Sequence, residues 1–226
     1  MGATTVGAYA HRCRQHSASN RQPGGSFKPI HQPRTRADMG SVHGKHRLTR
    51  SEARSLASQT HFTEKQIKKW HRIFLKDCPT GQLNRSAFLN MYTHFFPDGK
   101  AKDFYAHLFR TFDQDKSGQI DFSEFLTAIS VTQSGSPEEK LGLAFQLYDI
   151  DGNGTIEESE MTDIIKAIYM MVGETNPGPE NQPNVRTSAI FKKMDLNSDH
   201  VLSKEEFIRG CMNDEHLYNL LASSSS

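Results

Sequence analysis

The chain has 226 residues with 27 Lys/Arg and 26 Asp/Glu, and its 35% hydrophobic content is enough for one large domain or two small ones with a true core. No run of 18 apolar residues occurs, which argues against a membrane-spanning helix, and residues 1–15 lack the apolar stretch of a secretory signal. The three cysteines, Cys13, Cys78 and Cys211, are too few and too irregularly spaced for a disulfide framework, so we expect a cytoplasmic protein.

The charges are unevenly distributed along the chain. Residues 1–60 carry 10 Lys/Arg against 2 Asp/Glu, whereas residues 61–226 carry 17 against 24. Residues 1–47 are also rich in Ser, Gly, Pro and Gln and show no lasting apolar period, so we predict a disordered basic N-terminal extension. The excess of acidic residues in 61–226 could come from cation-binding sites.

The helical pattern begins at Leu48 with a weak amphipathic segment. Thr63 and Gln66 then have the spacing of a capping box, and Ser136 with Pro137 marks another helix start. Short loops, each with about three residues of strand, are expected between the helices. The pattern predicts helices over 63–75, 84–94, 101–112, 122–131, 137–148, 158–172, 184–194, 204–212 and 214–221.

An acidic 12-residue loop occurs three times, beginning at Asp113, Asp149 and Asp195, each time between two helical patterns. Helix, acidic loop, helix is the EF-hand. Such a loop points oxygen atoms inward from alternating positions, and Ca²⁺ takes about 6–8 oxygen ligands at roughly 2.3–2.6 Å. The sequence therefore predicts up to three Ca²⁺ sites, for which Mg²⁺ would compete.

The three loops differ at position 6, where the chain makes its sharp turn. Gly118 and Gly154 occupy it in the first two loops, but His200 does so in the third. A positive φ costs a non-glycine residue about 1 kcal/mol, so we expect weaker binding there. The predicted ligands, at positions 1, 3, 5, 7, 9 and 12, are Asp113, Asp115, Ser117, Gln119, Asp121 and Glu124; Asp149, Asp151, Asn153, Thr155, Glu157 and Glu160; and Asp195, Asn197, Asp199, Val201, Ser203 and Glu206.

A fourth loop, earlier in the chain, is predicted not to bind calcium. Lys76 stands at its position 1 and Ala87 at position 12, so a cation replaces the first carboxylate and the closing glutamate is absent. The loop keeps an apolar Leu83 at position 8, as the next two loops keep Ile120 and Ile156. We expect these residues to pair between neighbouring loops as short two-stranded ribbons.

The segments FTEKQIKKWHRIFLKDCPTGQL, LFRTFDQDKSGQIDFSEF and KLGLAFQLYDIDGNGTI resemble those of the neuronal calcium sensors, the recoverin, visinin, hippocalcin and neurocalcin group. The resemblance covers about residues 48–221 and includes the non-binding loop with its Cys78-Pro79 pair. It implies an all-α fold of four EF-hands in two paired lobes, at 48–133 and 134–221, with a tail at 222–226.

The resemblance also implies a sensor without catalytic activity. Calcium would expose an apolar groove that binds a helical segment of a target such as a channel, receptor, cyclase or kinase. Two other roles stay open: an accessory subunit like the potassium-channel-interacting proteins, and a passive calcium buffer. No nucleic acid is expected as a partner, and the protein would be a monomer or a dimer. The implied groove residues, which could equally be ordinary core aromatics, are Trp70, Phe74, Phe88, Tyr92, Phe95 and Phe96.

The N-terminus departs from the family pattern. Many members carry a myristoyl group on a glycine after the first methionine, but here Val6 stands where serine or threonine is wanted. We hypothesise that residues 1–38 are an extension and that Met39-Gly40 is an alternative start that exposes Gly40. A solvated arm without function is the competing interpretation for residues 1–38. A single acyl chain needs a second membrane signal, for which the basic candidates are Lys45, Arg47, Arg50 and Arg54.

Overall fold

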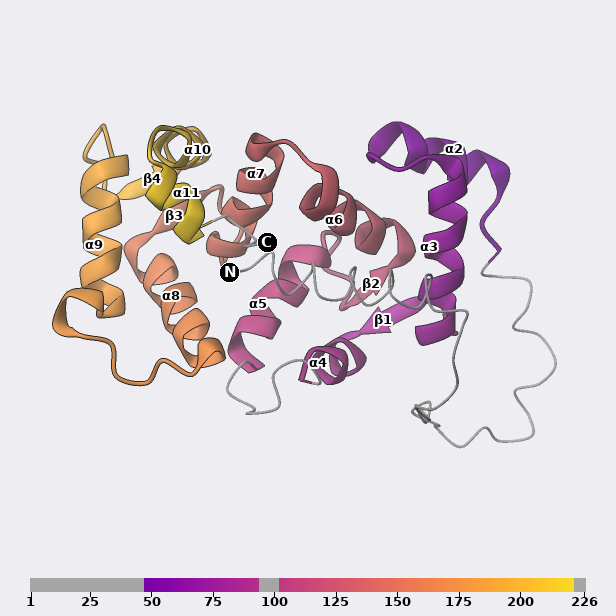
Figure 1. The fold of residues 1–226 in the computed structure, drawn as a ribbon, viewed down its shortest axis with the longest axis horizontal. Helices are drawn as coiled ribbons and strands as arrows, with labels where there is room; N and C mark the ends of the chain where they lie inside the picture. Colours follow the sequence, from indigo (N-terminus) through magenta and orange to yellow (C-terminus); the bar gives the residue numbers. More distant parts are fainter. Residues whose placement is uncertain (1–46, 94–101, 222–226) are drawn as a thin grey trace, which may run out of the picture.

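The computed structural model describes residues 47–93 and 102–221, which are helical apart from short strands and loops (Figure 1). This confirms the predicted all-α class. Most of the predicted extension therefore lies outside the described residues. The described α-helices are α2 (Arg50–Gln59), α3 (Glu64–Asp77), α4 (Arg85–Thr93), α5 (Lys102–Phe112), α6 (Phe122–Ser134), α7 (Pro137–Tyr148), α8 (Glu158–Val172), α9 (Pro183–Met194), α10 (Lys204–Asn213) and α11 (Glu215–Leu221).

In residues 47–93 and 102–221, four strands of three residues each lie in the loops between helices, and they form two antiparallel pairs. Leu83 lies opposite Ile120 in one ribbon, and Ile156 lies opposite Leu202 in the other. The predicted pairing through position 8 is thus confirmed. It joins the loop 76–87 to the loop 113–124 as an N-terminal pair, and the loop 149–160 to the loop 195–206 as a C-terminal pair. The strands are β1 (Gln82–Asn84), β2 (Gln119–Asp121), β3 (Thr155–Glu157) and β4 (Val201–Ser203).

Capping residues fix where several helices begin. The Thr63 hydroxyl oxygen accepts from the Gln66 backbone N–H at 3.4 Å, and the Gln66 side-chain oxygen accepts from the Thr63 N–H at 2.8 Å. Ser136 starts α7 by the same reciprocal arrangement with Glu139, and Pro137 follows at the first helical position. Both predicted helix starts are confirmed. The helices begin there because the caps satisfy backbone N–H donors that the first turn of a helix leaves free.

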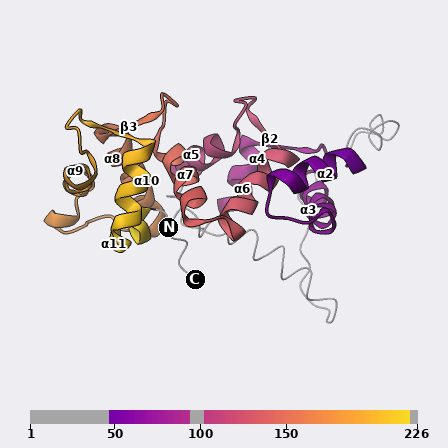
Figure 2. The same cartoon turned by 90° about the horizontal axis from the view of Figure 1, so that it is seen from above.

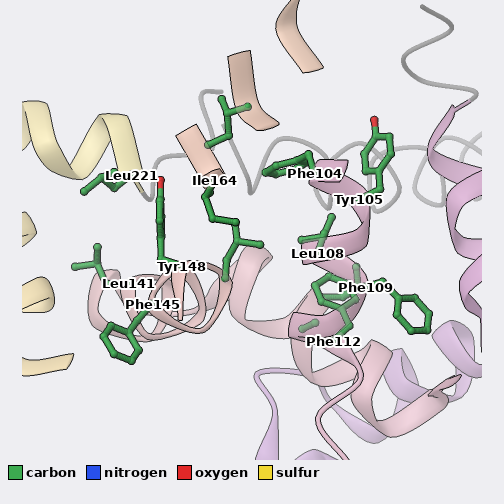
Figure 3. Packing of buried hydrophobic residues seen from close by; sticks show 14 of the residues in the cluster. Phe104, Tyr105, Leu108, Phe109, Phe112, Leu141, Phe145, Tyr148, Ile164 and Leu221 are labelled. Carbon is green, nitrogen blue, oxygen red and sulfur yellow. The ribbon is translucent and has the colours of Figure 1, made fainter. Parts of the chain in front are cut away.

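The buried side chains form a single connected cluster that runs through both pairs, from Leu56 to Leu221. Helix α5 lies at the centre of this cluster, and it contacts α4 on one side and α7 and α8 on the other. Figure 2 shows the elements arranged in a row along the long axis, with α5 and α7 in the middle. In the view of Figure 3, Ile164 of α8 lies between Tyr148 of α7 and the α5 side chains Phe104 and Leu108. The two pairs therefore share a core instead of forming separate globules.

The C-terminal helix α11 packs against α10 and α7, with Leu217 and Leu221 buried. The connection between α8 and α9 includes a short 3₁₀ turn, Pro179–Asn181. None of the helices in the described part of the chain combines the length and the apolar character needed to cross a membrane.

Candidate metal centres

Each of the three predicted calcium loops makes its turn at position 6 with a positive φ. The angle is 80° at Gly118, 90° at Gly154 and 66° at His200. The third loop therefore has the same backbone turn as the other two, although a side chain must be held in the left-handed region. The positive φ expected at His200 is therefore confirmed.

A second positive φ occurs at position 4 of the same loops, at Lys116 (57°), Gly152 (76°) and Ser198 (60°). We did not predict this turn from the sequence, and Gly152 alone signals it. The first loop of the chain has Pro79 at this position. Because the proline ring fixes φ near −65°, that loop cannot make the same turn. The loop 76–87 therefore differs from the three predicted calcium loops in its backbone as well as in its ligands.

The position-1 aspartates hold the loops closed through backbone N–H groups. Asp113 accepts from Ser117 and Gly118, both at 2.9 Å, and Asp149 accepts from Gly154 at 3.1 Å. Asp195 accepts from His200, also at 3.1 Å. These backbone N–H groups fix the orientation of each aspartate at the start of its loop.

The position-12 glutamates close the loops from the opposite end. Glu124 Oε1 accepts from the Gln114 N–H at 2.9 Å, and Oε2 accepts from the Asp121 N–H at 2.9 Å. Glu160 and Glu206 repeat the pattern with the backbone at positions 2 and 9 of their own loops. Both carboxylate oxygens of each glutamate are thus placed between the start of the loop and the start of the next helix.

The remaining predicted ligands are found in the strands, before the helices and at the loop tips. The position-7 residues Gln119, Thr155 and Val201 begin the strands β2, β3 and β4. The position-9 residues Asp121, Glu157 and Ser203 stand immediately before α6, α8 and α10. The position-3 and position-5 residues, which occupy the exposed tips of the loops, are Asp115, Ser117, Asp151, Asn153, Asn197 and Asp199.

Among the described residues, two groups of three carboxylates bring ligand atoms within 4.8 Å of one another. One is Asp113, Asp115 and Glu124, and the other is Asp149, Asp151 and Glu160. Three carboxylates so close repel one another, and a hard divalent cation that prefers oxygen relieves that repulsion. The donor set therefore fits Ca²⁺.

The surroundings of these carboxylates change their proton affinity in opposite ways. Burial raises the pKa of Glu124, against the lowering effect of the Asp121 and Asp115 N–H groups. Hydrogen bonds from Ser117 lower the pKa of Asp115, and those from Ser203 lower the pKa of Glu206. Hydrogen bonds thus favour the anionic form of Asp115 and Glu206, whereas burial disfavours it at Glu124.

The third loop has one carboxylate fewer at the corresponding positions. Asn197 stands at position 3, where the other loops have Asp115 and Asp151, and its amide donates to Asp199 at 2.8 Å. Glu206 is buried and hydrogen-bonded as in the other loops. Together with the strained φ at His200, the lower charge supports the expectation of weaker binding, because charge count sets EF-hand affinity.

The loop at 76–87 keeps the frame of an EF-hand without its ligands. Gly81 makes the position-6 turn at φ 76°, and Leu83 forms the ribbon with Ile120. Asn84 caps α4 by accepting from the Ala87 N–H at 2.9 Å. The frame therefore supplies the strand that pairs with the loop 113–124, as predicted from Leu83 and Ile120.

Three of the six implied groove residues lie in the core. Trp70, Phe74 and Phe88 are all buried, and Trp70 packs between Phe62 and Phe125 with ring centroids 6.1 Å from each. Tyr92 belongs to α4. The other two, Phe95 and Phe96, lie outside the described residues.

Comparison with known proteins agrees with this geometry. The EF-hand domain pair matches residues 138–212 and the EF hand domain matches residues 105–132. The chain is 37% identical to recoverin of Homo sapiens over 178 residues, which are 77% of this chain and 89% of recoverin. It is 46% and 44% identical to neuronal calcium sensor 1 of Lymnaea stagnalis and of Aplysia californica, each over 177 residues, 77% of this chain and 93% of the relative.

The fold and the loops define a calcium-binding EF-hand protein. More narrowly, the chain belongs to the neuronal calcium sensor family. It is a calcium sensor by its relatives, and the resemblance found in the sequence is confirmed.

Proposed function

We propose that calcium binding opens an apolar groove between α3, α4 and α6, and that the groove holds a helical segment of a target protein. The observation that carries this proposal is the position of Glu124, which lies between Phe122 and Phe125 in the first turn of α6. The residue that closes the metal loop is therefore next in sequence to residues of the aromatic packing.

Several aromatic rings meet at the contact between α3 and α6, and others meet where α4 packs on α5. Phe74 of α3 lies 5.6 Å from Phe122 and 5.1 Å from Phe125, measured between ring centroids, and Trp70 contacts Phe125 edge to face. Phe88 of α4 packs edge to face on the α5 rings. Separating α6 from α3 would expose several large rings at once, which is the kind of surface that amphipathic helices bind.

Glu124 links the metal loop to this packing. Its two carboxylate oxygens accept from the N–H groups of Gln114 and Asp121, and an ion in this loop would be held by both of them. A shift of the Glu124 side chain would move the start of α6, and with it Phe122 and Phe125. In sensor EF-hands this movement opens the helix pair, whereas buffer EF-hands barely open.

The six aromatic positions named from the resemblance, Trp70, Phe74, Phe88, Tyr92, Phe95 and Phe96, are the proposed groove lining. The proposed ligands are the eighteen positions predicted in the loops 113–124, 149–160 and 195–206, which we call the first, second and third working loops. Calcium is proposed to bind the first two more tightly than the third. The loop 76–87 is proposed not to bind.

We further propose peripheral membrane contact through the basic end of α2. Arg47, Arg50 and Arg54 are exposed there, while Lys45 lies outside the described residues. Such basic segments are attracted to anionic lipid by about 1 kcal/mol per charge.

No catalytic role is proposed. Cys78 and Cys211 are buried, and burial raises the pKa of each thiol to about 12, so neither is a reactive thiolate.

The proposal is tested by retention on a phenyl matrix. The wild-type chain should bind in calcium and elute with chelator, whereas Glu124→Gln should flow through in both conditions. Equal retention of wild type with calcium and with chelator would contradict the opening and would favour a buffer.

A further inference from the structure

Arg110, near the end of α5, connects the two EF-hand pairs. Its Nη1 donates to the backbone carbonyls of Asp149 at 2.6 Å and Gln146 at 3.2 Å, and its Nη2 donates to the Leu147 carbonyl at 2.8 Å. Arg110 stands three residues before Asp113, the first residue of one working loop. Its acceptors include Asp149, the first residue of the next. One side chain therefore spans the starts of two metal loops.

The acceptors are groups that need a donor. The last carbonyls of an α-helix have no partner within the helix and carry partial negative charge. Gln146 and Leu147 belong to the last turn of α7, and the planar guanidinium offers several donors in a fixed fork. None of the ion pairs among the described residues includes Arg110. Its contacts are with the α7 terminus, so its position depends on how α5 and α7 are oriented.

Charge also links Arg110 to the second working loop. Burial lowers the pKa of the guanidinium, while the nearby carboxylates Asp149, Glu160 and Asp151 act in the opposite direction. Two of these carboxylates are predicted ligands at positions 1 and 3, and the third closes the loop. The cation is therefore within electrostatic reach of the site that would receive Ca²⁺.

A second cation makes a similar approach. Lys116, at position 4 of the first working loop, has its Nζ 3.4 Å from where a Cβ on Gly152 would lie. Gly152 is position 4 of the second working loop. These two loops belong to different pairs and share no ribbon, yet their tips are neighbours.

We propose that Arg110 is a positioning residue that couples calcium binding at the loop 113–124 to calcium binding at the loop 149–160. Calcium changes the angle between the helices that flank a sensor loop. Helix α5 leads into the first of these loops and α7 leads into the second. A change in the angle of α5 shifts Arg110 relative to the end of α7, and the same linkage acts in reverse because coupling is reciprocal. The inference rests on the proposed calcium binding at both loops.

The coupling is measured with four full-length chains: wild type, Glu124→Gln, Arg110→Gln and the double variant. The affinity of the loop 149–160 is followed through the amide resonance of Gly154, whose N–H donates to Asp149. The measured quantity is the ratio of this affinity without and with the Glu124→Gln change. With Arg110 present, the two affinities should differ by about fivefold or more. With Arg110→Gln, they should differ by less than about twofold. A structural residue without a coupling role would change stability and leave the ratio of affinities the same.

Three controls make the result specific. Arg209→Gln makes the same chemical change at an exposed position of α10 and should leave the ratio unchanged. Arg110→Lys keeps the charge without the fork and should give an intermediate ratio, which also serves if Arg110→Gln does not fold. Without calcium, hydrogen exchange at Ile150 and Asp151 should be faster in Arg110→Gln, since the start of their loop loses an anchor.

The outcomes separate the two proposals. An unchanged ratio in the Arg110 variants, or a wild-type ratio near one with both loops binding, would overturn the coupling alone. A wild-type chain in which neither loop binds calcium would overturn the proposed calcium binding itself.

Discussion

The indole of Trp70 meets the ring of Phe125 edge to face, with centroids 6.1 Å apart. Phe125 follows Glu124 directly in the sequence, so the residue that closes a metal loop is the neighbour of the residue that covers the tryptophan. Trp70 is 8% exposed in this arrangement. Trp70 is the only tryptophan of the chain. Its fluorescence can therefore report on a change at the loop 113–124.

Replacing Glu160 by glutamine should weaken calcium binding at the second working loop. The change removes charge from one of the three clustered carboxylates. Losing a charged contact costs about 1.5–3 kcal/mol, so the affinity should fall by roughly tenfold or more. Isothermal titration calorimetry measures it.

Glu158→Gln is the matched control for this change. Glu158 is exposed two residues earlier on the same helix, and its replacement should alter affinity by about twofold at most. Similar losses in the two variants would show that net charge, not the Glu160 carboxylate, sets the affinity.

His200→Gly should stabilise the calcium-free protein. The residue has a φ of 66°, and relieving that strain gains about 1–2 kcal/mol, part of which the greater freedom of glycine in the unfolded chain offsets. A net gain near 1 kcal/mol corresponds to a rise of about 2–4 °C in Tm.

Gly154→Ala gives the opposite case for comparison. A Cβ there would meet nothing within 4 Å, so its cost comes from the φ of 90° alone, and Tm should fall. Calorimetry in chelator measures both variants. A fall for His200→Gly would mean that the imidazole makes a compensating contact.

Restoring ligands to the loop 76–87 should not be enough to restore calcium binding. Lys76→Asp, Cys78→Asp and Ala87→Glu together would supply carboxylates at positions 1, 3 and 12. Pro79 would still occupy position 4, where the working loops have φ between 57° and 76°. The triple variant should bind poorly, and adding Pro79→Gly should improve binding in calorimetric titrations. Binding by the triple variant that matches the loop 113–124 would show that the ligands alone were missing.

Much of the fold could be predicted because local signals agreed with one another. The capping pair at Thr63 and Gln66, the proline at 137 and the apolar position-8 residues each determine structure within a few residues. The loop spacing then places the ligands, because the EF-hand backbone is set by its own turn residues. These are short-range constraints, which a sequence states directly.

Two features could not be predicted because they depend on contacts between distant segments. The shared core arises where α5 packs against α7 and α8, and no local pattern specifies that orientation. The contact of Arg110 with the end of α7 follows from it, since 39 residues separate Arg110 from Asp149. The positive φ at position 4 was also missed, because Lys116 and Ser198 do not carry the glycine signal that Gly152 gives.

Opening of the groove is measured by a calcium titration of the full-length chain followed by Trp70 fluorescence and by uptake of an apolar dye, with magnesium present throughout. We expect a calcium-dependent change in the Trp70 emission together with dye uptake, both absent in Glu124→Gln and both retained in Glu158→Gln. Calcium binding by the wild-type chain with neither signal would contradict the opening of the groove and would identify a buffer.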